Sequence, residues 1–165
     1  MAEKIRAEKI RIVHYINQFF AGIGGEEKGD APLEYVDEPK GPGIGIKGAL
    51  GEDAEIVRTI WCGDNRINQE QEEVLSEIEE LIRSAKPDVV VAGPAFNAGR
   101  YGLACGMVMK LCGEKIGVPC ITGLYPENPA VEIYKRHGYI VPCAETAAGM
   151  RKDLPKIAAL TLKCG

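Results

Sequence analysis

The sequence predicts a three-layer α/β/α fold with a mostly parallel, Rossmann-like or flavodoxin-like sheet of about five strands. Short β-branched, apolar runs alternate along the chain with helical segments, as in sheets built from right-handed β-α-β crossovers. The run Asp-Val-Val-Val-Ala at 88–92 shows no polar alternation, which is typical of a strand covered by helices on both faces. The chain is 165 residues long, a length that suits one domain over 1–165 with one core.

Helices are predicted by spacing and by proline and glycine. Apolar residues three and four apart indicate an amphipathic helix that Asn68 caps. Pro129 is expected at the first position of another helix, where its missing N–H has no partner to lose. Pro155 places the regular start of the last helix near Leu154. The predicted helices are 69–85, 103–116, 129–136 and one from about Ala147 or Gly149 to Lys163.

Strands are predicted from short apolar, β-branched runs. The last run contains Pro142, which cannot donate to a ladder and therefore favours an edge position. The segment 26–51 is rich in glycine and proline, and we expect it to be irregular apart from one short helix near 46–50. An irregular segment of this length is expected to cover a site or a partner contact. The predicted strands are 9–15, 54–61, 88–92, 118–123 and 139–143.

Composition excludes several classes of protein. With 45% hydrophobic and 27% charged residues, the chain is neither disordered nor collagen-like. A net charge of −4 argues against a nucleic-acid or anionic membrane partner. No apolar run is long enough to span a membrane, and the charged start, MAEKIRAEKIR, lacks a signal-peptide core, so we expect a cytoplasmic protein. The six cysteines form no CxxC pair and have no histidine at ligand spacing, so no metal site is predicted.

The candidate site lies where the strands end. In open parallel sheets, ligands bind outside the carboxyl ends of the strands, near the point where strand order reverses. The loops after the predicted strands should therefore meet at one edge of the sheet. The residues predicted to bind substrate in those loops are Asn17, Asp64, Asn65, Gly93, Asn97, Gly99, Arg100, Tyr101, Tyr125 and Asn128.

The stretch GPAFNAGRYG, from Gly93 to Gly102, is the richest of these loops. Gly93 and Gly99 let a ligand approach the backbone, and Asn97 or Gly99 is expected to open the following helix. Arg100 offers a guanidinium group at the positive end of that helix. This combination suits a small carboxylate or a phosphate. The alternative interpretation is a strand-to-helix turn in which a neighbouring acid such as Asp64 holds Arg100.

Three other features are weaker indications of a functional site. The glycines at 43, 45 and 48 match GxGxxG, but they follow no predicted strand, so a nucleotide site there is not favoured. Cys62 follows a strand and is a candidate reactive thiol, with a packed thiol as the simpler interpretation. His14 lies within a strand and is interpreted as structural, and His137 lies at a helix end.

Five segments together resemble a known family. They are VHYINQFFAGIGGEEK from Val13, CGDN from Cys62, AGPAFNAGRYG from Ala92, ENPAVEIYK from Glu127 and AAGMRKDLP from Ala147. They resemble the N-terminal part of the selenoprotein B subunit shared by clostridial glycine, sarcosine and betaine reductases. The resemblance covers nearly the whole chain.

The resemblance implies an oxidoreductase that reductively cleaves the C–N bond of glycine or an N-methylated glycine in an anaerobic, amino-acid-fermenting cell. In this family a selenol attacks the α-carbon and displaces ammonia or an amine. The carboxymethyl group then passes to selenoprotein A and leaves it, after reduction, as an acetyl group. The implied partners are a processed proprotein subunit with a carbonyl-type (pyruvoyl) group, selenoprotein A and the small amino-acid substrate, in an oligomeric complex.

The family's selenocysteine lies in a C-terminal region that this sequence does not contain. No cysteine here takes its place, so the chain alone is expected to be inactive and to carry no cofactor. We expect a substrate-binding and assembly domain of component B, with Phe19, Phe20, Phe96 and Tyr101 placed to distinguish the methylation of the substrate nitrogen. The alternatives are an assembly module without a small-molecule pocket, docked through 26–51, and a nucleotide-binding domain of unrelated role.

Overall fold

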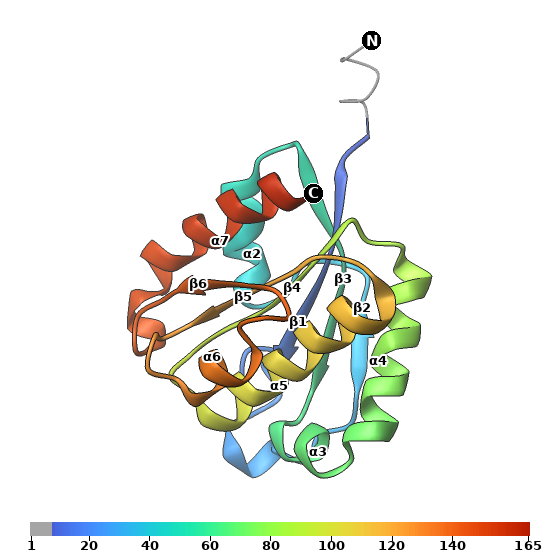
Figure 1. Ribbon diagram of the computed structural model, residues 1–165, viewed down its shortest axis with the longest axis vertical. Helices are drawn as coiled ribbons and strands as arrows, with labels where there is room; N and C mark the ends of the chain where they lie inside the picture. Colours follow the sequence, from blue (N-terminus) through green and yellow to red (C-terminus); the bar gives the residue numbers. More distant parts are fainter. Residues whose placement is uncertain (1–7) are drawn as a thin grey trace.

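A computed structural model describes residues 8–165 and shows a six-stranded sheet between two layers of helices (Figure 1). Residues 1–7, which hold most of the charged start of the chain, lie outside the described part. The strands are β1 (Ile10–Asn17), β2 (Glu34–Val36), β3 (Ala54–Cys62), β4 (Val89–Phe96), β5 (Cys120–Leu124) and β6 (Tyr139–Pro142). The helices of three turns or fewer are η1 (Glu26–Lys28), α2 (Pro42–Leu50), α3 (Asp64–Gln69), η2 (Cys112–Ile116), α6 (Pro129–Tyr134) and η3 (Ala147–Gly149), and the longer ones are α4 (Gln71–Ala85), α5 (Gly99–Leu111) and α7 (Met150–Cys164).

The strand order selects one of the two predicted sheet types. The order is β2-β3-β1-β4-β5-β6, with β2 antiparallel to β3 and every other neighbouring pair parallel. Numbered among themselves, the five parallel strands follow the order 2-1-3-4-5 of flavodoxin-like sheets. The order therefore reverses between β1 and β4, and β6 occupies the edge that Pro142 predicts.

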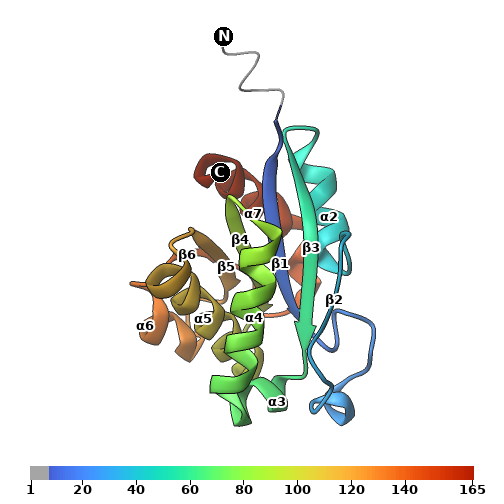
Figure 2. The ribbon, with the colours of Figure 1, turned by 90° about the vertical axis from the view of Figure 1, so that its right-hand side faces the viewer.

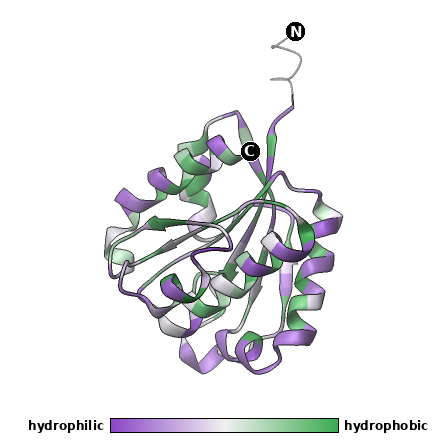
Figure 3. Cartoon of the chain, viewed as in Figure 1, coloured by the Kyte–Doolittle hydropathy of each residue, from purple (hydrophilic) through white to green (hydrophobic). Residues whose placement is uncertain are grey.

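Alternate residues of the central strands supply two separate cores. Along β1, Ile12 faces the core under α2 and α7, whereas Val13 and Tyr15 face the core under α4 and α5. Figure 2 shows these helices on opposite sides of the sheet, and Figure 3 shows the apolar strands between amphipathic helices. Every residue of β4 is buried, as the unbroken valine run predicts for a strand with two covered faces.

The prediction that 26–51 is mostly irregular was wrong. This segment contains η1, the added edge strand β2, and α2, which is longer than the short helix expected near 46–50. Pro42 begins α2, and Ile46 and Leu50 reach the core beneath it. The many glycines hid this helix because glycine lowers helix propensity, yet here they permit close packing.

Two of the three glycines of the GxGxxG match, Gly43 and Gly45, serve helix packing. A methyl group on Gly43 would lie 3.0 Å from His14 Nδ1, and one on Gly45 would lie 2.6 Å from Leu154 of α7. The α2 helix can therefore approach both β1 and α7 closely. His14 is fully buried, and its Nε2 lies 2.6 Å from the Gly93 carbonyl oxygen of β4, which ties the two strands at the switch point.

Two predicted helix boundaries also need correction. Asn68 does not cap a helix, because it belongs to α3, and α4 begins only at Gln71. Its side chain donates instead to the Asp64 carbonyl. The regular start of α7 lies at Met150 and not near Leu154, with Pro155 in the second turn. The α5 helix begins at Gly99, one of the two openings that the sequence offers for it, ahead of the predicted run 103–116.

We predict opposite effects of two glycine-to-alanine changes in helix interiors. A methyl group on Gly106 of α5 would overlap the ring of Tyr134 in α6, so Gly106→Ala should lower the free energy of unfolding by about 1–3 kcal/mol. Gly48 of α2 has no neighbour within 4 Å of an added methyl group, so Gly48→Ala should raise it by about 0.5–1 kcal/mol. Urea unfolding of both variants measures these changes. A stabilising Gly106→Ala would show that α5 and α6 do not pack as described.

Candidate functional site

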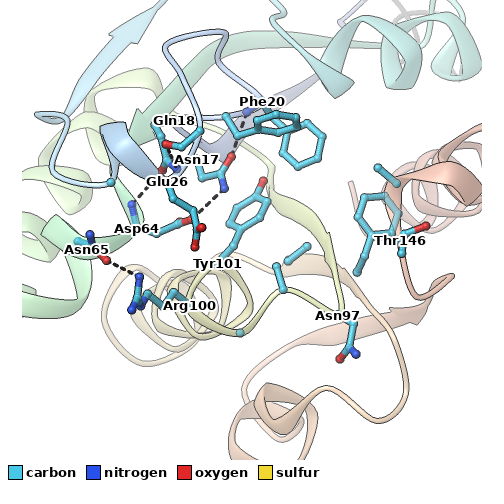
Figure 4. A pocket seen from close by; sticks show the side chains of 18 of the residues that line it. Asn17, Gln18, Phe20, Glu26, Asp64, Asn65, Asn97, Arg100, Tyr101 and Thr146 are labelled. Atoms are coloured by element: carbon cyan, nitrogen blue, oxygen red, sulfur yellow. Dashed lines mark hydrogen bonds between the residues drawn. The ribbon is translucent and has the colours of Figure 1, made fainter.

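A pocket opens at the carboxyl edge of the sheet, where β1 and β4 are neighbours (Figure 4). Its volume is about 720 Å³, and it is formed by the loop after β1, the start of α3, the β4–α5 junction and the loop after β6. This is the switch point that the strand order defines, and open parallel sheets bind ligands there. Seven of the ten predicted substrate-binding residues line it: Asn17, Asp64, Asn65, Asn97, Gly99, Arg100 and Tyr101.

Three predicted residues do not line the pocket. Gly93 is buried, and its carbonyl oxygen is the partner of His14. Asn128 caps α6 through Ala130 N and donates to the Phe96 and Ala98 carbonyls, so its role is to brace the β4–α5 turn. Tyr125 follows β5 and donates its backbone N–H to Phe96.

Asn17 connects three parts of the pocket wall. Its Nδ2 donates to Asp64 Oδ2 over 2.9 Å, and its Oδ1 accepts from Phe20 N over 3.0 Å. Since Asn17 is the last residue of β1, these bonds fix both the start of α3 and the turn after β1 relative to the sheet.

The two helices that begin at the pocket differ in how their first N–H groups are used. At α3, Gln18 Oε1 accepts from Asp64 N, and the Gly29 carbonyl accepts from Asn65 N and Arg66 N. At α5, Ala98 is the N-cap and provides no side-chain acceptor. Within residues 8–165, the N–H groups of Gly99, Arg100 and Tyr101 have no hydrogen-bond acceptor in the chain. A helix N-terminus with free N–H groups attracts an anion.

Arg100 lies exposed at this helix start. Its Nη1 donates to Asn65 Oδ1 over 2.9 Å, so an amide and not the carboxylate of Asp64 holds the guanidinium group. This differs from the turn interpretation, in which a neighbouring acid such as Asp64 holds it. The neutral partner leaves the positive charge of Arg100 available to a ligand.

Asp64 is a carboxylate with little compensation for its charge. Partial burial raises its pKa to about 6, against the lowering effects of the Asn17 hydrogen bond and the Arg100 charge. Its Oδ1 has no hydrogen-bond partner within the described residues. A buried acceptor of this kind favours a ligand that brings a donor or a positive charge.

An aromatic wall completes the pocket. Phe20 lies with its ring centroid 5.8 Å from that of Tyr101 and 6.5 Å from that of Phe96, and Phe19 lies edge-on to Phe20 at 5.1 Å. All four rings line the pocket, as the sequence predicts for Phe19, Phe20, Phe96 and Tyr101. Phe19 is 59% exposed at the rim, whereas Tyr101 is buried.

Sequence reasoning missed the part of the wall that comes from the segment 26–51. Glu26 and Gly29 line the pocket, because η1 folds back over the start of α3. The only sequence signal was the length of that segment, which indicated that it covers a site. Glu145 and Thr146 line the opposite side, and both lie in a loop that the strand pattern placed at this edge.

Cys62 is a packed thiol. It is fully buried, and burial raises its pKa to about 12, which disfavours the nucleophilic thiolate. Burial also raises the pKa of Cys143 to about 12. The structure thus supports the simpler interpretation of Cys62 and not the reactive one.

The described residues offer neither a metal cluster nor a membrane-spanning helix. No group of three or more His, Cys, Asp and Glu side chains within 8–165 has the arrangement of a metal site. Over the same residues, no helix combines the length and the apolar character that a membrane span needs.

Comparison with known proteins identifies relatives along almost the whole chain. Residues 9–165 match the family model of the glycine/sarcosine/betaine reductase selenoprotein B (GRDB). The chain is 54% identical over 156 residues to the glycine reductase complex component B subunit gamma of Carboxydothermus hydrogenoformans, which covers 94% of this chain and 36% of that protein. No solved structure matches the chain.

Two relatives from Peptoclostridium acidaminophilum carry other substrate names. The sarcosine reductase complex component B subunit beta is 47% identical over 94% of this chain, and the betaine reductase complex component B subunit beta is 38% identical over 93%. The chain spans 36% and 35% of their lengths. With a family match from residue 9 to residue 165, the chain belongs to the glycine/sarcosine/betaine reductase selenoprotein B family.

Proposed function

We propose that this chain is a substrate-binding and assembly domain of component B of a glycine, sarcosine or betaine reductase. Such a reductase reductively cleaves the C–N bond of glycine or an N-methylated glycine and yields an acetyl group and ammonia or an amine. The names of the relatives support the reaction class. The main support for the binding role is the N-terminus of α5, which has no side-chain cap and lies beside Arg100 in the pocket at the switch point.

The α5 N-terminus is suited to the substrate carboxylate. The free N–H groups of residues 99–101 and the guanidinium group of Arg100 are donors that belong to the same part of the pocket lining. An anion there gains hydrogen bonds and the favourable end of the helix dipole. Arg100 is therefore the proposed carboxylate anchor, and Asn97 and Gly99 form part of its polar surroundings.

The charge of the pocket favours a zwitterion over a phosphate. Glu26, Asp64 and Glu145 line it together with Arg100, so acidic side chains outnumber the basic one among the described lining residues. A nucleotide would bring two or more negative charges to this surface, which like charges disfavour. An amino acid brings one negative and one positive charge and can satisfy both kinds of group.

The same edge also presents a surface suited to assembly. Phe19 and Ile23 in the loop after β1, Tyr35 in β2 and Ile44 in α2 are exposed by 42% to 65%. All four belong to the segment 19–44, and Tyr35 and Ile44 lie within 26–51, which the sequence predicts to cover a site or a partner contact. Apolar side chains exposed on such a segment suit a protein partner. We propose that this surface meets the remainder of the subunit or the processed proprotein subunit, and that selenoprotein A acts on the assembled complex.

The reacting groups of the family are proposed to lie outside this chain. The selenol supplies the nucleophile and the carbonyl-type group activates the substrate when they are present. Cys62 and Cys143 do not fit the role of a nucleophile here, because burial raises the pKa of both thiols to about 12. The residues of this chain would hold the substrate and orient it.

An assembly module without a small-molecule pocket is the second candidate. The exposed apolar residues on 19–44 favour it. Titration of the chain with glycine, sarcosine and betaine separates the two candidates. Binding of any of them supports the substrate domain, and co-purification with the partner subunit without such binding supports the module.

We predict that Arg100→Ala weakens the binding of glycine, sarcosine or betaine to the chain by at least tenfold. The reason is the loss of a charge-assisted hydrogen bond to the carboxylate, which contributes about 1.5–3 kcal/mol. Arg151→Ala is the matched control, because Arg151 is also exposed in the first turn of a helix but does not line the pocket. Isothermal titration measures both, and unchanged binding in Arg100→Ala would remove the anchor assignment.

We predict that Asp64→Asn stabilises the fold at neutral pH. The folded pKa of Asp64, about 6, lies above its ordinary value of 3.8, so ionised Asp64 destabilises the folded state. The destabilisation begins near pH 4 and is complete above pH 6. The groups facing Asp64 are Arg100, Tyr101 and Cys105 of α5, Tyr15 of β1 and Cys62 of β3.

Thermal melts between pH 4.5 and pH 8 test this prediction. The Tm of Asp64→Asn should exceed that of the unmodified chain at pH 7, and the difference should shrink as the pH falls. Asp37→Asn is a control in which the change in Tm should have the opposite sign. Arg58 lowers the pKa of Asp37, so ionised Asp37 stabilises the fold above the acidic range, and its removal should lower the Tm. A Tm difference for Asp64→Asn that does not change with pH would show that Asp64 has an ordinary pKa.

A further inference from the structure

Two polar atoms of the pocket wall lack hydrogen-bond partners. They are Asp64 Oδ1 and the hydroxyl of Tyr101, and both side chains line the pocket. Tyr101 is 1% exposed, and burial raises the pKa of its phenol, whereas the Asn17 backbone N–H lies close enough to the hydroxyl oxygen to oppose that rise. Within 8–165, however, no acceptor takes the hydrogen of this hydroxyl. Buried polar groups are nearly always paired, so two orphans in one wall indicate that a bound molecule supplies the partner.

The charge at this place also lacks a partner. Asp64 accepts a hydrogen bond from the neutral amide of Asn17, and no Lys, Arg or His within 8–165 lies at ion-pair distance from it. Arg100 donates a hydrogen bond to Asn65, the residue that follows Asp64 in the sequence. Burial raises the pKa of Asp64, and the positive charge of Arg100 opposes this rise without forming an ion pair with it. The carboxylate and the guanidinium group are therefore near enough to interact, and an α-amino acid carries charges of the opposite signs a short distance apart.

Figure 4 shows how these side chains are distributed. Asn17, Asp64, Arg100 and Tyr101 lie on one side of the pocket, and Asn97 and Thr146 lie away from them on the other. The hydroxyl of Tyr101 points toward Asn17 and away from Arg100. The side chain and the backbone of Tyr101 thus face different parts of the pocket. The hydroxyl lies toward Asn17 and Asp64, whereas the backbone N–H lies at the start of α5.

We propose, on the basis of the proposed function, that Asp64 and Tyr101 form the subsite for the substrate's amine nitrogen and that they favour a nitrogen that still carries N–H. An ammonium or methylammonium group can donate to Asp64 or Tyr101 while its positive charge compensates the carboxylate. A trimethylammonium group has no N–H and leaves both orphan atoms unpaired.

The aromatic side chains agree with this preference. A quaternary ammonium group is recognised by aromatic rings that surround it on several sides. Here Phe20 packs against Tyr101 and Phe96 with interplanar angles of 37° and 48°, so the rings contact one another and form a wall on one side. A wall contributes contact to the substrate without replacing the hydrogen bonds that a trimethylated nitrogen cannot make.

Tyr101→Phe tests the subsite, with Tyr15→Phe as the matched control. The hydroxyl of Tyr15 is also buried and unpaired and also lies near Asp64, but Tyr15 does not line the pocket. Either change removes one unpaired hydroxyl from the core. Only the change at Tyr101 should affect the ligand.

The chain is titrated with glycine, sarcosine, betaine and acetate, and binding is followed through the amide NMR signals of residues 99–101. Acetate carries the carboxylate alone. We expect glycine and sarcosine to bind more tightly than betaine or acetate. In Tyr101→Phe, glycine binding should weaken about fivefold to tenfold, the size of one hydrogen bond, and acetate binding should stay the same. Tyr15→Phe should change neither.

The outcomes separate this inference from the proposed function. If the unmodified chain binds neither acetate nor any of the three amino acids, the proposed function fails and the subsite fails with it. If acetate and glycine bind equally, or betaine binds as tightly as glycine, the carboxylate anchor stands and the nitrogen subsite is overturned. Asp64→Asn is the second variant: loss of the preference for glycine over betaine supports the subsite, and retention of that preference contradicts it.

Discussion

The hydrogen bond between Asn17 Nδ2 and Asp64 Oδ2 is the contact on which the candidate site depends. It joins the end of β1 to the start of α3, and the other side of the same amide holds the turn at Phe20. Together with the bond from Asp64 N to Gln18 Oε1, it ties the aromatic wall and the carboxylate into one unit. Because the amide is neutral, it orients Asp64 but leaves its charge uncompensated.

The two helices that start at the pocket differ in whether their first N–H groups are bonded within the chain. The loop after β1 closes the N-terminus of α3 through Gln18 and Gly29, whereas the N-terminus of α5 stays open beside Arg100. Unused N–H groups at a helix start have to be satisfied by solvent or by a ligand. The acidic side chains Glu26 and Glu145 limit which anions suit that position, because they disfavour a multiply charged one.

Some features of the site could not be read from single residues. Asn128 and Gly93 are residue types that often meet ligands, yet contacts with Phe96, Ala98 and His14 make them structural. Gly43 and Gly45 of the GxGxxG match likewise support the packing of α2 on β1 and α7. In each case the partner is far away in the sequence, so local spacing carried no information about it.

The α/β class, the five parallel strands, the edge position of β6 and the edge of the sheet to which the polar loops lead can all be predicted from the sequence. These follow from hydrophobic periodicity and from the local effects of proline and glycine, which act over a few residues. The strand order, the formation of β2 and α2, and the contribution of Glu26 to the pocket emerge only from the folded chain. The reason is that strand pairing and close helix packing are decided by contacts between distant segments, and such contacts override weak local propensity.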